Sequence, residues 1–227
     1  LYTNGESTEK LEDLKAVTYN LEGGKVVASK LNTRSGVFSE NVSKNTIRKK
    51  FALPNVREGS IIEYEYTHTS DFLFKLPAWY FQGEIPGLWS EYKASLPQFL
   101  DYVMLQQGNL PFAIESNTEK QGSYVVQISK EVYKGQMERE RYDLTCMVAD
   151  YRWVMKDIPA FHAEAFTSSP ENHVSKLRFQ LSGMKDPLPV KTILASWPEF
   201  TSDFLKKTDF INEAEKAGDW WPAEMKE

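Results

Sequence analysis

The chain has 227 residues, of which 41% are hydrophobic and 13% aromatic, so it is able to bury a core and is not a disordered tail. Its 27 basic and 32 acidic residues give a net charge of −5 without a long run of one sign, which argues against nucleic acid as a partner. No stretch approaches the ~20 apolar residues of a membrane-spanning helix, and the single cysteine, Cys146, has no second cysteine for an intrachain disulfide.

The first elements in chain order are a predicted hairpin and a predicted turn. Leu21–Lys25 contains two adjacent glycines between the apolar runs Val17–Tyr19 and Val26–Val27, which is typical of a tight β-hairpin. Asn55–Gly59 predicts a turn, because its final glycine adopts a positive φ at little cost.

Two later runs alternate apolar and polar side chains with the period of a half-buried antiparallel strand. They span residues 61–66 and 91–96. The side chains expected on the inner face are Ile62, Tyr64 and Tyr66 in the first run, and Tyr92, Ala94 and Leu96 in the second. Glu91, Lys93 and Ser95 are expected to face outward.

Further short strands are predicted at residues 124–128, 131–133 and 178–181. We expect a turn at Gln121–Gly122 before the first of them, and a break at Ser129–Lys130 between the first two. No repeating strand–helix–strand unit occurs. Many short strands with turns between them predict an all-β fold, a large antiparallel β-sandwich.

One short helix is predicted near the C-terminus, beginning at Ser196. Ser196 and Glu199 fit a capping box, in which each side chain accepts a hydrogen bond from the other residue's amide. Pro198 fits the first turn, whose amides have no helical partner. Residues 209–227 are rich in charged side chains around Trp220–Pro222, and we expect a connector there.

A series of motifs in fixed order resembles one known family and covers nearly the whole chain. The motifs are Phe51–Ser60 (FALPNVREGS), Ile61–Tyr64, Phe72–Phe74, Leu76–Trp79, Phe81–Gln82, Ile85–Pro86, Ser90–Tyr92, Trp153–Pro159 (WVMKDIP), Ser169–Asn172, Lys176–Leu181 (KLRFQL) and Ser196–Phe200. They resemble the bacterial domain of unknown function that precedes transglutaminase-like (Cys-His-Asp) domains. The resemblance implies a saddle-shaped β-sandwich like that at the N-terminus of zinc aminopeptidases.

The resemblance also implies a domain organisation. Residues 1–195 would form the β-sandwich domain, lacking its first strands, and residues 196–227 the capped helix and a connector toward a following transglutaminase-like domain. The chain itself would be non-catalytic, within a cysteine peptidase or transferase of the periplasm or cell surface. Missing strands would leave a sheet edge open, so we expect weak homodimerisation through that edge.

No set of residues predicts catalysis, a metal or a cofactor. Cys146 lies in an apolar, strand-like run, whereas a nucleophilic thiolate normally lies at a helix N-terminus. His68, His162 and His173 do not form a His-Glu-x-x-His zinc motif. The acidic residues among aromatic ones, Asp71, Glu84 and Glu91, would serve glycoside hydrolysis only at a suitable separation in space. The likeness to aminopeptidases keeps a cryptic hydrolase as a third hypothesis.

The candidate binding or interface residues are Trp79, Tyr80, Trp89, Trp153 and Asn172. A module that binds sugar or peptide presents flat aromatic side chains on an exposed surface. Trp79 and Phe81 alternate with Tyr80, so at least one face of that strand must belong to the core. Our preferred hypothesis is an accessory domain that positions or helps bind a peptide or protein substrate. The alternative is a free-standing carbohydrate- or peptide-binding module.

Overall fold

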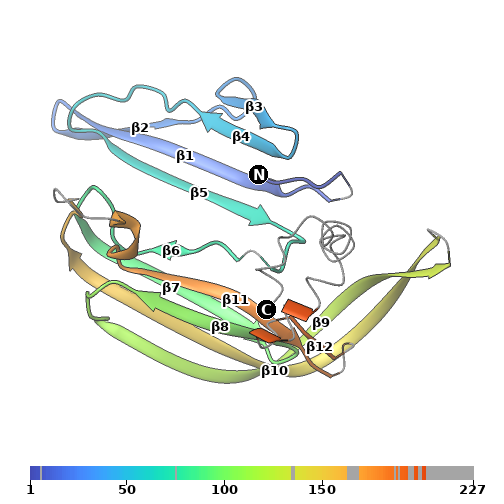
Figure 1. Cartoon of the computed structure of the whole chain (residues 1–227). Coiled ribbons are helices and arrows are strands. Elements are labelled where there is room, and N and C mark those ends of the chain that lie inside the picture. The colour runs from blue at the N-terminus through green and yellow to red at the C-terminus, as the bar shows by residue number, and fades with distance from the viewer. Residues whose placement is uncertain are drawn as a thin grey trace, which may run out of the picture. The chain divides into compact units, whose positions relative to one another are not determined.

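The computed structural model describes residues 1–5, 7–74, 76–133, 136–162, 169–186, 188, 190–193, 197–198 and 201–202. It confirms the predicted all-β fold, and its sheets are antiparallel (Figure 1). The chain divides into two compact units, unit 1 (Leu1–Leu73) and unit 2 (Phe74–Glu227). Within the described residues, no helix has the length and apolar character needed to cross a membrane.

Unit 1 contains a three-stranded sheet and a separate hairpin. The sheet has the order β2-β1-β5, from β1 (Lys10–Glu22), β2 (Lys25–Lys30) and β5 (Ile61–Thr69); the hairpin pairs β3 (Val37–Ser43) with β4 (Thr46–Phe51). The predicted hairpin turn is confirmed, because Gly23 and Gly24 connect β1 to β2 with φ of 55° and 76°. The second predicted turn is confirmed by positive φ at Asn55 and Gly59.

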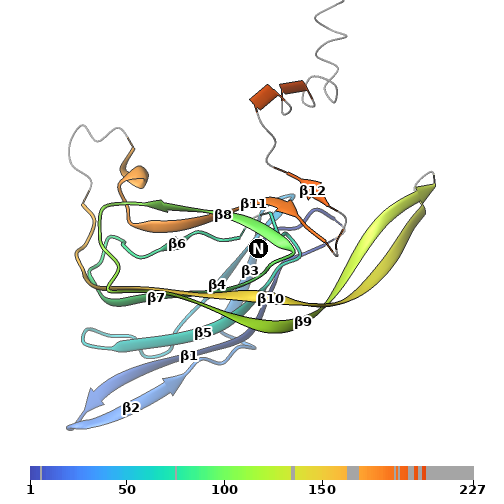
Figure 2. The same cartoon turned by 90° about the horizontal axis from the view of Figure 1, so that it is seen from below.

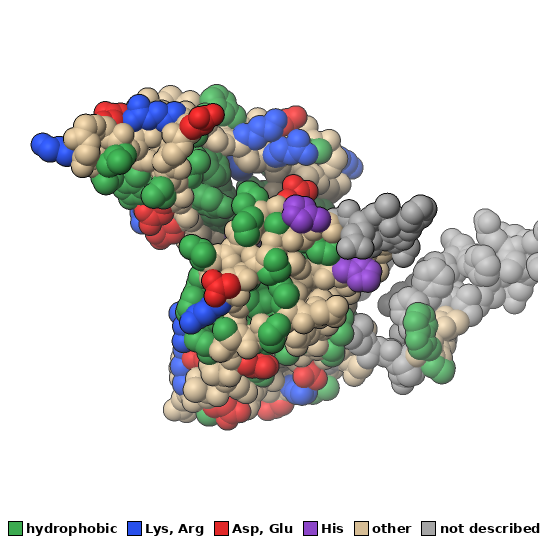
Figure 3. Space-filling model, turned by 90° about the vertical axis from the view of Figure 1, so that its left-hand side faces the viewer, with side chains coloured by type: hydrophobic (Ala, Val, Ile, Leu, Met, Phe, Trp, Pro, Cys, Tyr) green, Lys and Arg blue, Asp and Glu red, His purple; other side chains and the backbone are tan. Residues whose placement is uncertain are grey.

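Strand β5 confirms the predicted strand but not its predicted burial. Tyr64 and Tyr66 share a face and stack, with ring centroids 6.4 Å apart. All nine residues of β5 are nevertheless exposed. The opposite residues on β1, Ala16 and Thr18, are buried but too small to form a deep core. Large apolar side chains of this unit therefore lie at its surface among charged ones (Figure 3).

Unit 2 contains two antiparallel sheets in separate layers (Figure 2). The first has the order β7-β10-β9, from β7 (Gly87–Pro97), β9 (Ile114–Tyr133) and β10 (Gln136–Ile158). The second is centred on β11 (Lys176–Met184), which pairs with β8 (Leu100–Gln107) along one edge and with β6 (Trp79–Tyr80) and β12 (Lys191–Thr192) along the other. A 3-10 turn, Pro170–Asn172, precedes β11.

The core of unit 2 joins these two sheets. Trp153 of β10 is 1% exposed and stacks on Tyr151 at 5.1 Å and on Tyr92 of β7 at 6.0 Å between ring centroids. Phe179 of β11 contacts the same indole at 6.0 Å. As predicted, Tyr92, Ala94 and Leu96 pack against this core.

The long strand β9 contradicts two sequence predictions. The turn at Gln121–Gly122 and the break at Ser129–Lys130 are both wrong, since one strand runs through these positions and pairs with β10. A Cβ on Gly122 would lie 2.7 Å from the Cγ2 atom of buried Val148. The glycine therefore makes room for a neighbouring side chain instead of forming a turn.

The predicted C-terminal helix is only partly described. Trp197, Pro198, Thr201 and Ser202 have helical backbone, and the Thr201 hydroxyl donates to the Trp197 carbonyl at 2.7 Å. The capping-box residues, Ser196 and Glu199, the connector at 209–227 and the domain boundary at 195/196 lie outside the described residues. The saddle-shaped sandwich over residues 1–195 and the weak homodimer stay predictions.

Candidate functional site

The predicted binding residues occupy three different places in unit 2. Trp153 is in the core, so it cannot contribute to an exposed platform. Trp79 faces the same core from β6, where it stacks on a ring of β7 at 5.4 Å. Tyr80 lies on the outer face of the β11 sheet, near the 3-10 turn that ends at Asn172. Trp89 lies on the outer face of the other sheet, 48% exposed.

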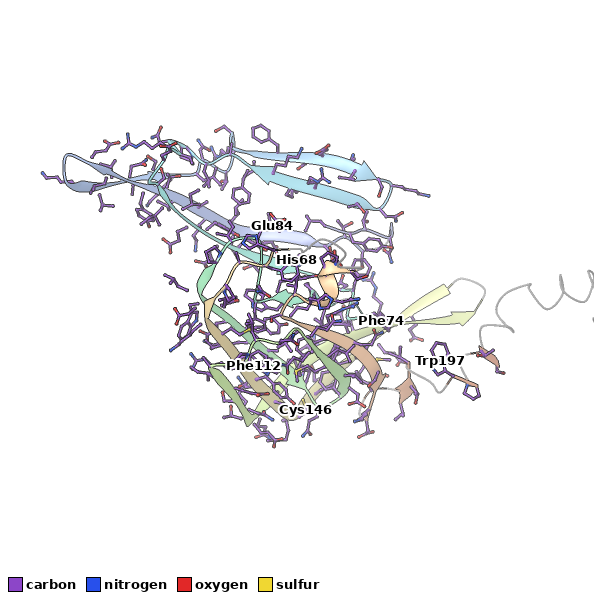
Figure 4. All side chains as sticks on the ribbon, turned by 60° about the vertical axis from the view of Figure 1, so that its left-hand side comes forward. His68, Phe74, Glu84, Phe112, Cys146 and Trp197 are labelled. Carbon is purple, nitrogen blue, oxygen red and sulfur yellow. The ribbon has the colours of Figure 1, made fainter. Side chains whose placement is uncertain are left out.

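Tyr80 lines a pocket of about 420 Å³ on the outer face of the β11 sheet. The segment that leads into β6 pairs with β11 only through Trp79 and Tyr80. The pocket occupies the fork where that segment leaves β11, with Phe74 (labelled in Figure 4) in its wall. We call it the fork pocket; its lining residues are Phe74, Leu76, Ala78, Tyr80, Glu171, Lys176, Arg178, Phe179 and Gln180.

Lys176 is the buried charge of the fork pocket. This residue is 4% exposed, and its Nζ donates a hydrogen bond to the main-chain carbonyl of Glu171 at 2.6 Å. The same Nζ lies 5.3 Å from the centroid of the Tyr80 ring, which stabilises a cation on its face. Among the described residues, no carboxylate forms an ion pair with Lys176. A buried ammonium normally has a counter-charge, so Lys176 has the capacity to bind an anion.

Arg178 adds a second cation on the same face of β11. It is exposed, and within the described part of the chain it too has no ion-pair partner. Two cations therefore line the pocket against one carboxylate, that of Glu171. Opposite them stands an apolar wall from the segment before β6, formed by Phe74, Leu76 and Ala78. Cations beside an apolar wall suit a ligand with a carboxylate and an apolar part.

A second polar surface lies on the outer face of the β7-β10-β9 sheet. We call it the paired-charge face; it comprises Trp89, Glu91, Lys93, Ser95, Ser116, Thr118, Lys120, Asp150, Arg152 and Lys156, and it holds a shallow hollow of about 330 Å³. The Glu91 carboxylate accepts from Arg152 at 2.9 Å and from the Trp89 indole at 2.9 Å, and pairs with Lys93 at 3.0 Å. These hydrogen bonds, that from Arg152 foremost, lower the pKa of Glu91 to about 2.

The second carboxylate of the paired-charge face, that of Asp150, is neutralised in the same way. Asp150 pairs with Lys120 at 2.6 Å and accepts from the Ser95 hydroxyl. The hydrogen bond from Lys120, and then that from Ser95, lower the pKa of Asp150. Lys156 lies over the Trp89 ring, 4.8 Å from its centroid. Both carboxylates of this face have cationic partners and none of its cations is buried, so the face by itself does not call for an ionic ligand.

Two of the residues considered for catalysis or metal binding have packing or ion-pair contacts of their own. Cys146, labelled in Figure 4, lies on β10. It packs against a second core cluster that includes Phe99 and Leu144. His68 of unit 1 pairs with Glu9 at 3.4 Å. Over the described residues, no three or more histidine, cysteine, aspartate or glutamate side chains gather as metal ligands do.

Lys176 and Arg178 are the site residues that the sequence reasoning missed. Their signal is the alternation in Lys176–Leu181 (KLRFQL), where polar residues occupy one face and Leu177, Phe179 and Leu181 the buried one. The strand was predicted, but a lysine on its outer face is ordinarily solvated. Its burial comes from Tyr80 and Glu171, which the fold brings to it.

Comparison with known proteins does not assign the chain to a family. No family model matches it, and searches of curated proteins and of solved structures found no match either. The resemblance to the domain that precedes transglutaminase-like domains therefore stays a prediction.

Proposed function

We propose that this chain is a non-catalytic accessory domain that binds an acidic segment of a peptide or protein substrate in the fork pocket. It would serve a larger transglutaminase-like (Cys-His-Asp) protein of the bacterial envelope, as the sequence motifs imply. The observation that carries the binding role is Lys176, a buried ammonium at the wall of an open pocket, without a carboxylate partner among the described residues.

The proposal explains why a lysine is buried there. Lys176 uses one of its three donors on the Glu171 carbonyl. A ligand carboxylate would accept from a second donor and from the guanidinium of Arg178, and would supply the counter-charge. The side chain next to that carboxylate would pack on Phe74 and Leu76. A peptide with an acidic residue beside an apolar one matches both halves of the pocket.

A peptide array tests the binding role. The probes are acetylated and amidated nonapeptides, each with one central Glu, beside copies with Gln in its place. We expect the Glu peptides to bind, the Gln copies to bind at least tenfold more weakly, and Lys176→Met to abolish the difference. Lys156→Met is the matched control, because it also removes one positive charge and one cation–π contact, but on the other sheet.

Two outcomes contradict the binding role. One is equal binding of Glu and Gln peptides by the wild-type chain. The other is equal loss of binding in Lys176→Met and Lys156→Met, which would assign the effect to net charge and not to the pocket. Circular dichroism of both variants checks that each retains its β structure.

The accessory role has its own experiment. The chain is titrated calorimetrically with the transglutaminase-like domain that we expect after it in the gene. We expect binding with a negative heat-capacity change, which is the mark of buried apolar surface. Catalysis by the isolated chain at the level of the whole protein, or the absence of binding between the two domains, would contradict the proposal.

The paired-charge face favours a second candidate function, the binding of a neutral glycan. Trp89 is half exposed there, and its neighbours Glu91 and Arg152 are held in place by mutual hydrogen bonds. A sugar ring stacks on an aromatic side chain, and its hydroxyl groups form hydrogen bonds with charged groups fixed beside that side chain. A glycan array tests this candidate, and binding that Trp89→Ala does not weaken would contradict it.

A further inference from the structure

One edge of β11 is open between two short strands. β8 pairs with β11 over almost its whole length. On the other edge, β6 pairs only with Lys176 and Leu177, and β12 only with Gly183 and Met184. Among the described residues, no strand pairs with Arg178–Leu181 on that edge. The open stretch borders the fork pocket, whose lining includes Arg178, Phe179 and Gln180.

The backbone groups that reach this open edge belong to two buried residues. In an antiparallel strand the N–H and C=O of one residue point to one side, and those of the next residue to the other. The Ser175 carbonyl accepts from the Phe81 amide, so it points toward the β6 edge. By alternation, the backbone groups of Phe179 and Leu181, which precede the register shift between Leu181 and Gly183, point to that edge as well. These residues are 7% and 1% exposed, and buried backbone groups are nearly always paired in folded proteins.

We infer that the open edge of β11 accepts an added β-strand from the substrate, so that the acidic segment binds in the fork pocket as an extended chain between β6 and β12. Main-chain hydrogen bonds to Phe179 and Leu181 supply the pairing. The four open residues, Arg178–Leu181, span about 13 Å, enough for a short extended segment. This inference rests on the proposed function and adds the mode of recognition.

Strand addition also fixes a side-chain pattern for the substrate. A substrate residue opposite Arg178 would lie on the outer face, next to the position opposite Lys176 that Tyr80 occupies. Because Lys176 and Arg178 both line the pocket there, this substrate residue would be acidic. The next residue, opposite Phe179, would face the core and would be apolar. The third, opposite Gln180, would return to the outer face and would be polar. The expected partner is an extended acidic–apolar–polar segment.

Backbone methylation of the bound peptide tests the inference. The strongest Glu nonapeptide from the array is remade twice, with N-methyl groups on its odd residues or on its even residues. A peptide that binds as a strand pairs through alternate residues only. We therefore expect one methylated peptide to lose at least tenfold in affinity and the other to lose much less. The wild-type chain, Lys176→Met and Lys156→Met are titrated with all three peptides.

The outcomes separate the two proposals. Small and equal effects of both methylations, with binding still dependent on Lys176, would overturn strand addition and leave the acidic pocket in place. Equal and large effects of both would also overturn it, because strand pairing uses only alternate residues. Binding that does not depend on Lys176 would overturn the proposed function itself.

Discussion

The two outer surfaces of unit 2 use their charges in opposite ways. On the paired-charge face, Glu91 and Asp150 are each held by cations, and every charge there is accessible to water. In the fork pocket, Lys176 is buried and its only polar contact among the described residues is a carbonyl oxygen. The sheets that carry these surfaces share one core and one pattern of alternation. The surfaces differ in whether they hold a buried charge that lacks a counter-charge among the described residues.

This difference identifies which surface is prepared for an ionic ligand. Exposed ion pairs contribute little to stability and have no unmet demand for a partner. A buried charge without a counter-charge is destabilising, and it is retained where a ligand or a function requires it. The charge density of a surface is therefore a poor guide to whether it binds an ionic ligand. The burial and pairing of its charges are a good guide.

The largest effect is expected from the core that both surfaces share. Trp153→Ala removes a buried indole that contacts β7 and β11, and it should lower the free energy of unfolding by about 3–5 kcal/mol. Denaturant unfolding followed by circular dichroism measures the loss. Trp89→Ala is the matched control, since it removes an exposed indole and should cost much less. Similar losses in the two variants would show that Trp153 does not join the sheets as described.

The next effect concerns the sheet beneath the paired-charge face. Gly122→Ala places a Cβ 2.7 Å from the Val148 side chain, and it should lower the free energy of unfolding by about 1–3 kcal/mol. In the double variant with Val148→Ala the clash is absent, so the combined loss should be smaller than the sum of the single losses. Additive losses would contradict the packing role of the glycine.

Local patterns and long-range packing explain which features the sequence predicted. The inward face of Tyr92, Ala94 and Leu96 follows from strict alternation within one strand, and it was predicted correctly. Gly122 was misread as a turn, because its reason is a side chain of the neighbouring strand. One face of β5 was predicted to be buried but is exposed. Alternation predicts which side chains share a face of a strand, but not whether another element covers that face.

The candidate site was only half accessible to sequence reasoning for the same reason. Tyr80 was singled out as one of a group of aromatic residues, and Asn172 as part of the Ser169–Asn172 motif. Lys176 acquires its role from the Glu171 carbonyl and the Tyr80 ring, which reach it through the turn before β11 and through pairing with β6. The strand pattern alone places a lysine on an outer face, where it would ordinarily be solvated.

A smaller effect tests the comparison directly by removing one cation from each surface. Lys176→Met replaces an unpaired buried ammonium by an apolar side chain of similar length, so it should raise the free energy of unfolding by about 1 kcal/mol. Arg152→Met should instead lower it, because Glu91 loses its strongest hydrogen-bond donor. Unfolding of both variants in the same denaturant series measures the two signs. Destabilisation by Lys176→Met would show that the ammonium has a stabilising partner and would weaken the case for an anionic ligand.

The smallest effect is a pH dependence that belongs to the paired-charge face alone. The pKa of Glu91 is lowered from 4.5 to about 2 in the folded chain, by Arg152 first and then by Lys93 and Trp89. A carboxyl group with a depressed pKa stabilises the fold above its unfolded pKa, and this stabilisation is lost as the pH falls from 4.5 toward about 2. Denaturant unfolding at pH 6 and pH 3 measures the loss.

Two variants assign this acid loss to one surface. Glu91→Gln should make the acid loss smaller, and Lys176→Met should leave it unchanged, because no carboxylate of the described chain depends on Lys176. An acid loss that Lys176→Met also reduces would mean that a carboxylate of the protein does reach the fork pocket, and the contrast between the two surfaces would then fail.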